Sequence, residues 1–379
     1  MKKLFYFGTL FLVLFEMANV YFIMPMPGSQ KMESLDLAYF LYSWRWLFRI
    51  LFMLMILAGI RFAFSTSKWL VLGSILLLLG IAYACNFIMA ADSMFKQPVA
   101  LIFKNSAENK VETGRLILGI SLNGESKAYP IQFIGYHHQV RDSIGGKPIM
   151  VTYCTVCRTG RVFEPLIEGK AEEFRLVGMD HFNAMFEDKS SGSWWRQVSG
   201  KAVAGPMKGK SLPEIPSNQT TLEKWIELYP NTLIMQADEK FKEKYEGVSK
   251  YEYGESKSKL TLRDQASWKD KSWVIGVENG SESKAYDWNR LQKERIIHDV
   301  LGGQPVVIIL GGDNNSFVAL ERQNKEQLFN LRNDSLISAD NRYNFIGISS
   351  DSTKSNLKRL NAYQEYWHSW QIFHPLTKK

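Results

Sequence analysis

Residues 117–151 read ILGISLNGESKAYPIQFIGYHHQVRDSIGGKPIMV, and a related stretch, VIGVENGSESKAYDWNRLQKERIIHDVLGGQPVVII, follows at 274–309. Without a gap, Gly119 falls on Gly276 at an offset of 157 residues, and the Lys-Ala-Tyr and Gly-Gly-x-Pro motifs coincide. A constant offset through glycines, a proline and apolar positions indicates a tandem repeat. The sequence therefore predicts two related units in the C-terminal part of the chain.

A second match lies further along the chain. LEKWIELYPNT (222–232) aligns with WHSWQIFHPLT (367–377), so that Trp225 falls on Trp370 at an offset of 145. Each copy shows two strand-like runs around a turn (Asn-Gly in the first copy), a short helical stretch, a Gly-Gly turn and a β-branched strand. Thr221 is expected to cap the helix that closes the first copy. This order predicts a strand-rich α+β fold of two tandem related units, preceded by three transmembrane helices.

Residues 1–91 are mostly apolar and predict a membrane anchor of three helices, at 4–24, 46–64 and 69–91. The first and third runs are long enough to cross about 30 Å of hydrocarbon, and the second carries arginines only near its ends. Glu16 lies inside the first run, where a carboxylate must find a polar contact or a proton. We expect Glu16 to face the other two helices as a protonated carboxyl, and the alternative is a polar contact with a partner helix.

The positive charges around these helices predict their orientation. Lys2 and Lys3 precede the first helix and Arg61 and Lys68 flank the second loop, whereas the first loop mixes basic and acidic residues. The positive-inside rule then places the N-terminus in the cytoplasm. We therefore predict a multi-pass protein of the inner (cytoplasmic) membrane whose C-terminal domain lies outside the cytoplasm.

Charge also limits the partners. The chain has 46 basic and 38 acidic residues, and the part after the anchor is nearly balanced, with no basic stripe. Such a distribution argues against nucleic acid binding and leaves a protein or small-molecule partner open. The predicted domains are the anchor (1–91), a first α+β unit with the cysteine pair (92–240), a charged linker (241–269) and a second, degenerate unit without cysteines (270–379).

The stretch VTYCTVCRTGRVFE (151–164) holds Cys154 and Cys157 as a C-x-x-C pair. At the repeat offset these positions are Gly311 and Asn314, so the fold does not need the thiols. A strand-like run follows the pair, whereas a thioredoxin-type dithiol starts a helix, so a lowered thiol pKa would have to come from the arginines after the pair. A redox dithiol, a metal clip for a soft ion such as copper, and a plain turn disulfide all remain open.

A second segment, FEDKSSGSWWRQVSGKAVAG (186–205), alternates polar and tryptophan residues like the wall of a pocket. The alternative is an edge strand whose tryptophans complete the core. The sequence lacks the common nucleophile-elbow, phosphate-loop, dinucleotide and zinc-protease motifs, so it leaves open whether the protein is an enzyme. We predict catalytic roles for Cys154, Cys157, Asp188 and Gln197, and a binding pocket that includes Arg158, His181, Trp194 and Trp195.

These segments, with the helix LEKWIELYPNT and the run KYEGVSKYEYG, resemble the bacterial and archaeal family known as domain of unknown function 3179. That family shows a T-Y-C-P-x-C-x-[ST]-[GA] segment, a D-x-x-T-x-S-x-W-x-Q run and a W-x-x-x-x-P-x-T helix. The resemblance covers about residues 99–260 and, more weakly, the second copy. Thr155 and Ser191 depart from the pattern, where the family has proline and threonine. The family's activity is unassigned, so the resemblance implies an exported protein with a site but no reaction.

Together, these features predict a membrane-anchored extracytoplasmic protein with a thiol-centred site in the first unit, for redox chemistry or metal handling. The alternative is a non-catalytic binding or structural module in which the C-x-x-C pair is only a turn disulfide.

Overall fold

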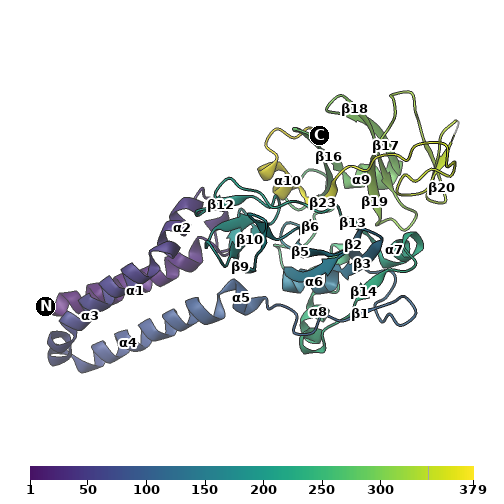
Figure 1. The fold of residues 1–379 in the computed structure, drawn as a ribbon. Helices are drawn as coiled ribbons and strands as arrows, with labels where there is room; N and C mark the ends of the chain where they lie inside the picture. The colour runs from purple at the N-terminus through teal and green to yellow at the C-terminus, as the bar shows by residue number, and fades with distance from the viewer. Residues whose placement is uncertain (340) are drawn as a thin grey trace. The chain divides into compact units, whose positions relative to one another are not determined.

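The computed structural model describes residues 1–339 and 341–379, and the chain divides into two compact units (Figure 1). The helical unit comprises Met1–Lys96 with Glu172–Ser211, and the sheet unit comprises Gln97–Ala171 with Leu212–Lys379. This division cuts through the predicted domain 92–240, because residues 172–211 pack with the N-terminal helices. The predicted boundaries rest on the sequence repeat and stay a prediction. Each unit is described by itself.

Three long apolar helices dominate the helical unit. Lys2–Tyr21, Arg45–Thr66 and Lys68–Ile88 are each long and apolar enough to span a membrane, which confirms the predicted three helices. The third ends in a π-helical turn. In Figure 1 these elements are α1 (Lys2–Tyr21), α3 (Arg45–Thr66), α4 (Lys68–Tyr83) and the π-turn η2 (Ala84–Ile88).

Two glycines allow α1 and α3 to pack closely. A Cβ atom on Gly59 would lie 2.4 Å from the backbone nitrogen of Phe5, and one on Gly8 would lie 2.9 Å from the Cβ of Met55. Small residues at such contacts are typical of helix pairs in membranes, where close backbone approach replaces the hydrophobic driving force.

The rest of the helical unit is a small antiparallel sheet that packs on α2 (Leu35–Ser43). Trp194 is buried there, and its ring meets Tyr39 edge to face with centroids 5.0 Å apart. In spatial order the strands are β12 (Ala202–Ala204), β11 (Trp194–Arg196), β10 (Asn183–Asp188) and β9 (Phe174–Asp180), and the short helices η1 (Ser29–Lys31) and α5 (Ala91–Met94) complete the unit.

The first half of the sheet unit begins with the predicted hairpin. Asn123 and Gly124 both have positive φ values, 51° and 82°, as a two-residue type I′ turn requires. The side chain of Thr221 accepts a hydrogen bond from the Lys224 backbone and caps the following helix, as predicted. The elements of this half are β2 (Leu116–Leu122), β3 (Glu125–Pro130), α6 (Ile131–His137), β4 (Gln139–Ile144), β5 (Lys147–Cys154), β6 (Thr159–Phe163), β13 (Asn218–Thr221) and α7 (Leu222–Leu228).

The second half repeats this order of elements. A hairpin leads through a short helix into a three-stranded antiparallel sheet, and a strand followed by a helix closes the half. Its elements are β15 (Trp273–Asn279), β16 (Glu282–Asp287), α9 (Trp288–Glu294), β17 (Ile296–Leu301), β18 (Gln304–Leu310), β19 (Phe317–Glu321), β23 (Ala362–Tyr366) and α10 (Trp367–Phe373) (Figure 1).

Equivalent positions of the two halves make equivalent contacts. A Cβ atom on Gly119 would lie 2.5 Å from the Trp225 ring, and one on Gly276 would lie 2.1 Å from the Trp370 ring. Each indole also donates a hydrogen bond to the threonine seven positions later, at 2.8 and 2.7 Å. The two tryptophans therefore fill corresponding places against glycines that leave room for them.

Further elements surround these halves. The first half's five-stranded sheet has the order β1-β14-β3-β2-β13, in which only β14 and β3 run parallel. The remaining elements are β1 (Phe103–Lys104), β7 (Leu166–Ile167), β8 (Lys170–Ala171), β14 (Leu233–Met235), η3 (Glu239–Phe241), α8 (Lys242–Val248), η4 (Tyr251–Tyr253), β20 (Asn330–Arg332), β21 (Ser335–Ile337) and β22 (Arg342–Tyr343).

Candidate functional site

The two cysteines lie at the turn between β5 and β6. Cys154 ends β5 and pairs in register with Thr159 at the start of β6, so residues 155–158 form the turn. Arg158 closes the turn with a left-handed backbone, φ 58°, which costs a residue with a side chain about 1–2 kcal/mol. Contacts of the Arg158 side chain compensate for this cost.

The guanidinium of Arg158 is buried and bonded on several sides. Its Nε donates to Gln364 Oε1 at 2.8 Å, and its Nη atoms donate to the carbonyls of Tyr251 and Glu252 at 3.2 and 3.0 Å. Its face lies 3.7 Å from the centroid of the Trp273 ring. Arg158 therefore anchors the turn to residues far along the chain.

Both thiols lie in the described part of the chain, are fully buried, and are not joined in a disulfide. Burial raises the pKa of the Cys157 thiol well above its ordinary value, and Cys154 raises it further through a hydrogen bond and through charge repulsion. A hydrogen bond with the Ser369 hydroxyl opposes this rise. The Cys157 thiol is therefore protonated at neutral pH.

Lys271 supplies a positive charge beside the pair. Its Nζ donates a 2.8 Å hydrogen bond to the carbonyl of Val156, between the two cysteines, and lies 4.5 Å from the centroid of the Tyr366 ring. Burial lowers the pKa of Lys271 to about 8, while charge on the two cysteines favours the ammonium form. An amine that loses its proton near pH 8 beside two thiols can take up a thiol proton.

A buried carboxylate, Glu365, lies next to the pair. It accepts hydrogen bonds from Arg161 Nη2 (2.9 Å), Thr159 Oγ1 (2.7 Å) and Ser369 Oγ (2.9 Å). Ser369 thus links Glu365 to the Cys157 thiol. The sequence left Arg158 and Arg161 as the cations that could lower a thiol pKa. In the structure Arg161 pairs with Glu365, and Arg158 donates to two carbonyls and to Gln364.

His368 lies beside Ser369 in the first turn of α10, where the charge of Lys271 acts on it. The ring is buried, and its Nδ1 lies 3.1 Å from the carbonyl oxygen of Asp270. Burial, followed by the positive charge of Lys271, lowers the pKa of His368 to about 3. The imidazole is therefore neutral at neutral pH and adds no second positive charge beside the dithiol.

We call Cys154, Cys157, Lys271, Glu365 and Ser369 the thiol site. Sequence reasoning missed the last three, because they lie in or next to the copy without cysteines. The alignment of LEKW with WHSW carried a signal, since Glu365 falls on a threonine and Ser369 on a lysine beside the matched tryptophans.

The predicted pocket residues of segment 186–205 belong to the helical unit. The buried Asp188 carboxylate accepts hydrogen bonds from the backbone and hydroxyl of Ser191 (2.6 and 2.8 Å), from the Ser193 backbone (3.2 Å) and from the Trp195 indole (2.8 Å). These bonds shape the turn at 189–193. The two tryptophans, Trp194 and Trp195, are buried, as in the interpretation that they complete a core.

The other predicted residues of this segment also have local partners. Gln197 Oε1 accepts a 3.0 Å hydrogen bond from Asn183 Nδ2, and both side chains are buried. His181 Nδ1 lies 2.7 Å from Asp180, and this hydrogen bond raises the pKa of His181. The structure thus describes Asp188, Gln197 and His181 in one unit and Cys154, Cys157 and Arg158 in the other. Their joint role in one site stays a prediction.

The predicted copper clip gains no third ligand from the described His, Cys, Asp and Glu side chains. Across residues 1–339 and 341–379, no group of three or more His, Cys, Asp or Glu side chains is placed to hold a metal ion. The pair Cys154 and Cys157 would have to bind alone beside the Lys271 ammonium, whose charge opposes a cation.

Comparison with known proteins identifies the family. The model for a protein of unknown function, DUF3179, matches residues 99–377, so the chain belongs to this family and the predicted resemblance is confirmed. No curated protein and no solved structure matches the chain. The match covers both halves of the sheet unit, including the half without cysteines.

Proposed function

For this member of the DUF3179 family, we propose a thiol–disulfide redox function in which Cys154 and Cys157 alternate between dithiol and disulfide. The observation that carries the proposal is the contact of Lys271 with the carbonyl between the two thiols, at 2.8 Å. Besides bonding this turn carbonyl, a positive charge there stabilises a thiolate when one forms on either cysteine, which supports thiol chemistry. The substrate class is a disulfide, of a small molecule or of another protein.

The proposed reaction proceeds in two exchanges. Neutral Lys271 accepts the proton of one thiol, and the thiolate attacks a substrate sulfur to give a mixed disulfide. The departing substrate sulfur takes the proton from Lys271, and the second thiol repeats the sequence on the mixed disulfide. The net change oxidises Cys154 and Cys157 to a disulfide and reduces one substrate disulfide to two thiols.

The burial of the two thiols limits which disulfides can react with them. Cys154 and Cys157 are both 0% exposed, so the turn must open before a disulfide reaches them. Once substrate is admitted, Ser369 and Glu365 offer a polar path beside Cys157, and the ion pair with Arg161 balances the carboxylate. We therefore expect slow reaction with bulky disulfides and faster reaction with flat, small ones.

An aromatic disulfide that releases a coloured thiol tests the proposal. Full-length chain with Cys85→Ala, which removes the third cysteine, should release two equivalents of thiol from dithiodipyridine. With Cys154→Ser added, one equivalent should be released, because the mixed disulfide cannot resolve. A folded Cys85→Ala chain that releases no thiol would overturn the redox function and support a structural turn.

We infer further that the sheet unit lies outside the cytoplasm. The three apolar helices and the distribution of basic residues around them support this orientation. A C-terminal alkaline phosphatase fusion should be active and a C-terminal cytoplasmic reporter dark. The opposite pattern would contradict the extracytoplasmic location.

We also propose that the two halves of the sheet unit arose by duplication. The equivalent Gly119–Trp225 and Gly276–Trp370 contacts support it. Gly119→Ala and Gly276→Ala should each destabilise the chain by about 3 kcal/mol through overpacking. Gly114→Ala is the control for steric effects, because no atom lies within 4 Å of a Cβ at Gly114 and its backbone does not have a left-handed φ. A neutral outcome at only one of the two matched glycines would contradict equivalent packing.

A further inference from the structure

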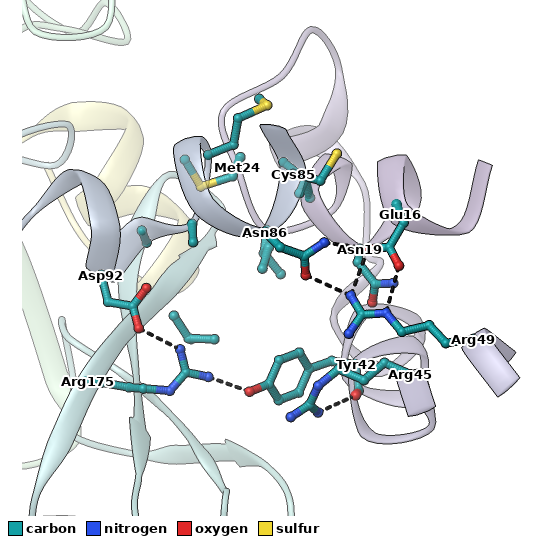
Figure 2. A pocket seen from close by; sticks show the side chains of 16 residues that line it. Glu16, Asn19, Met24, Tyr42, Arg45, Arg49, Cys85, Asn86, Asp92 and Arg175 are labelled. Atoms are coloured by element: carbon teal, nitrogen blue, oxygen red, sulfur yellow. Dashed lines mark hydrogen bonds and ion pairs between the residues drawn. The ribbon is translucent and has the colours of Figure 1, made fainter. Parts of the chain in front are cut away.

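The three apolar helices meet in a polar network at one end of the bundle (Figure 2). Arg49 of α3 donates from Nε and Nη2 to the two carboxylate oxygens of Glu16 on α1, at 2.6 and 2.7 Å. Asn86 accepts from Arg49 (2.7 Å) and donates to Glu16 (2.8 Å). Glu16 thus faces the other two helices as predicted. It is held there as one partner of a bidentate ion pair, whereas the sequence predicted a protonated carboxyl.

The π-helical turn η2 brings the third helix into this network. Asn86 lies in that turn, and its Nδ2 donates to the carbonyl of Ala82 at 2.9 Å as well as to Glu16. Single π-turns inside α-helices are frequent at functional sites. The network lies where α1 ends, α3 begins and the third helix ends, so it belongs to the end of the bundle away from the N-terminus.

A cavity of about 230 Å³ opens beside this network. Arg45, Arg49 and Arg175 line it together with the carboxylates Glu16 and Asp92 (Figure 2). Arg49 is matched by Glu16, and Arg175 is matched by Asp92 at 3.1 Å and by a further carboxylate behind it, Glu187 at 2.7 Å. Two of the three arginines therefore have their charges balanced within the protein.

Arg45 is the exception. It donates to the Tyr42 carbonyl at 2.6 Å, and its guanidinium lies 3.9 Å from the centroid of the Tyr42 ring. Among the residues that the structure describes, no carboxylate lies within 4.0 Å of its nitrogens. An arginine has five donors in a planar fork that suits a phosphate. Arg45 thus offers an anion most of its donors at the mouth of the polar cavity.

An apolar groove of about 360 Å³ continues from the cavity along α1. Val20, Cys85 and Met89 line both spaces, and Leu14 and Met17 extend the groove toward the middle of the helix. Since α1 is apolar enough to span a membrane, this groove faces the acyl chains of a bilayer. The two spaces together match a molecule with an anionic head and an apolar tail.

We propose that this site binds an anionic phospholipid, with the phosphate on Arg45 at the polar cavity and one acyl chain in the groove along α1. Basic side chains between membrane helices near the interface are a known setting for lipid headgroups. The site is independent of the thiol site and of the proposed redox function, since none of the thiol-site residues lines it.

The test compares lipids on the full-length chain in a neutral detergent, by thermal stability and by lipid adducts in native mass spectrometry. Phosphatidylglycerol should bind at least about fivefold more tightly than phosphatidylcholine, the preference that one basic residue near a membrane surface provides. Arg45→Gln should abolish the preference, and Arg45→Lys should retain it. Arg61→Gln, at the other end of α3, is the matched control and should change nothing.

Three outcomes would overturn the proposal. Equal binding of both lipids by the wild-type chain would mean that the groove takes apolar chains without regard to charge. Stabilisation by inorganic phosphate alone, equal to that by phosphatidylglycerol, would make the site a free-anion site. If Arg45→Gln fails to fold, Ala18→Trp, which fills the groove without touching the arginines, should lower phosphatidylglycerol binding, and unchanged binding would count against the lipid.

Discussion

The two equivalent turns of the sheet unit share a register and differ in chemistry. In the first half Cys154 pairs with Thr159 across residues 155–158, and in the second Leu310 pairs with Phe317. The second turn is built around a carboxylate, because Asp313 accepts from the Ser316 backbone (2.8 Å) and hydroxyl (2.5 Å) and from Thr221 Oγ1 (2.8 Å). The thiol turn instead relies on Lys271 and on the second half. The scaffold tolerates either turn, and the partners of the first turn point to a function.

The halves also exchange contacts across the sheet unit. The backbone of Thr221, at the first half's closing helix, donates to Ser316 Oγ in the second turn at 3.0 Å. The backbone of Tyr366, at the second half's closing helix, donates to the Cys157 carbonyl in the first turn at 2.9 Å. Each half therefore closes the other half's turn. This crossed arrangement explains how a copy without cysteines contributes to the thiol site.

The largest expected difference between the halves is in the free energy of unfolding that is lost on substituting Glu365 and its counterpart Thr220. Glu365→Gln removes the closest carboxylate from buried Arg161 and should cost about 3–5 kcal/mol of unfolding free energy. Thr220→Val should change stability by less than about 1 kcal/mol, because the buried Thr220 hydroxyl has no hydrogen-bond partner among the described residues. Denaturant unfolding of the full-length chain measures both. Equal costs would contradict a special role for Glu365.

The next difference is in the pH dependence of the thiols. Because burial lowers the pKa of Lys271 to about 8, one proton should leave the thiol site near pH 8, and the rate of thiol alkylation should rise there. In Lys271→Met the buried thiol must ionise alone, with its raised pKa, so the rate at pH 8 should fall about tenfold or more.

Lys224→Met is the matched control for this experiment. Lys224 lies in α7, three residues after Thr221, whose backbone contacts the second turn. Its Nζ pairs with Asp334 at 2.8 Å. Its loss should leave the alkylation profile unchanged. A profile that moves equally in both variants would show a general effect of charge and would remove Lys271 from the thiol site.

The smallest expected effect is on the stability that Asp313 gives the turn between β18 and β19. Burial alone would raise the pKa of Asp313, but hydrogen bonds from Ser316, Asn315 and Thr221 hold it below its ordinary value. A lowered folded pKa stabilises the fold above the ordinary pKa of about 4 and loses this effect as pH falls through the folded value. Asp313→Asn should therefore cost about 1 kcal/mol at pH 7, and this cost should shrink as the pH falls through the folded pKa of Asp313. Cys154→Ser should show no such acid dependence, and a parallel trend in both would contradict this difference.

The sequence predicted the elements whose causes are local. The sequence predicted three long apolar helices, the hairpin at Asn123-Gly124 and the helix cap at Thr221, and the structure confirms these elements. Lys271 and Glu365 lie more than a hundred residues from Cys157 and reach it only through tertiary packing, so no local pattern could place them. The packing of residues 172–211 with the N-terminal helices also depends on distant contacts.

The most direct test is an equilibrium between the dithiol and a glutathione redox buffer. Full-length chain with Cys85→Ala is equilibrated at pH 7 across a range of glutathione ratios, quenched in acid and alkylated, and its thiols are counted by mass. We expect Cys154 and Cys157 to lose both thiols together, reversibly, while the fold is retained. A folded chain whose two thiols remain reduced in fully oxidised glutathione, or in which only a single mixed disulfide forms, would contradict a redox pair at this turn.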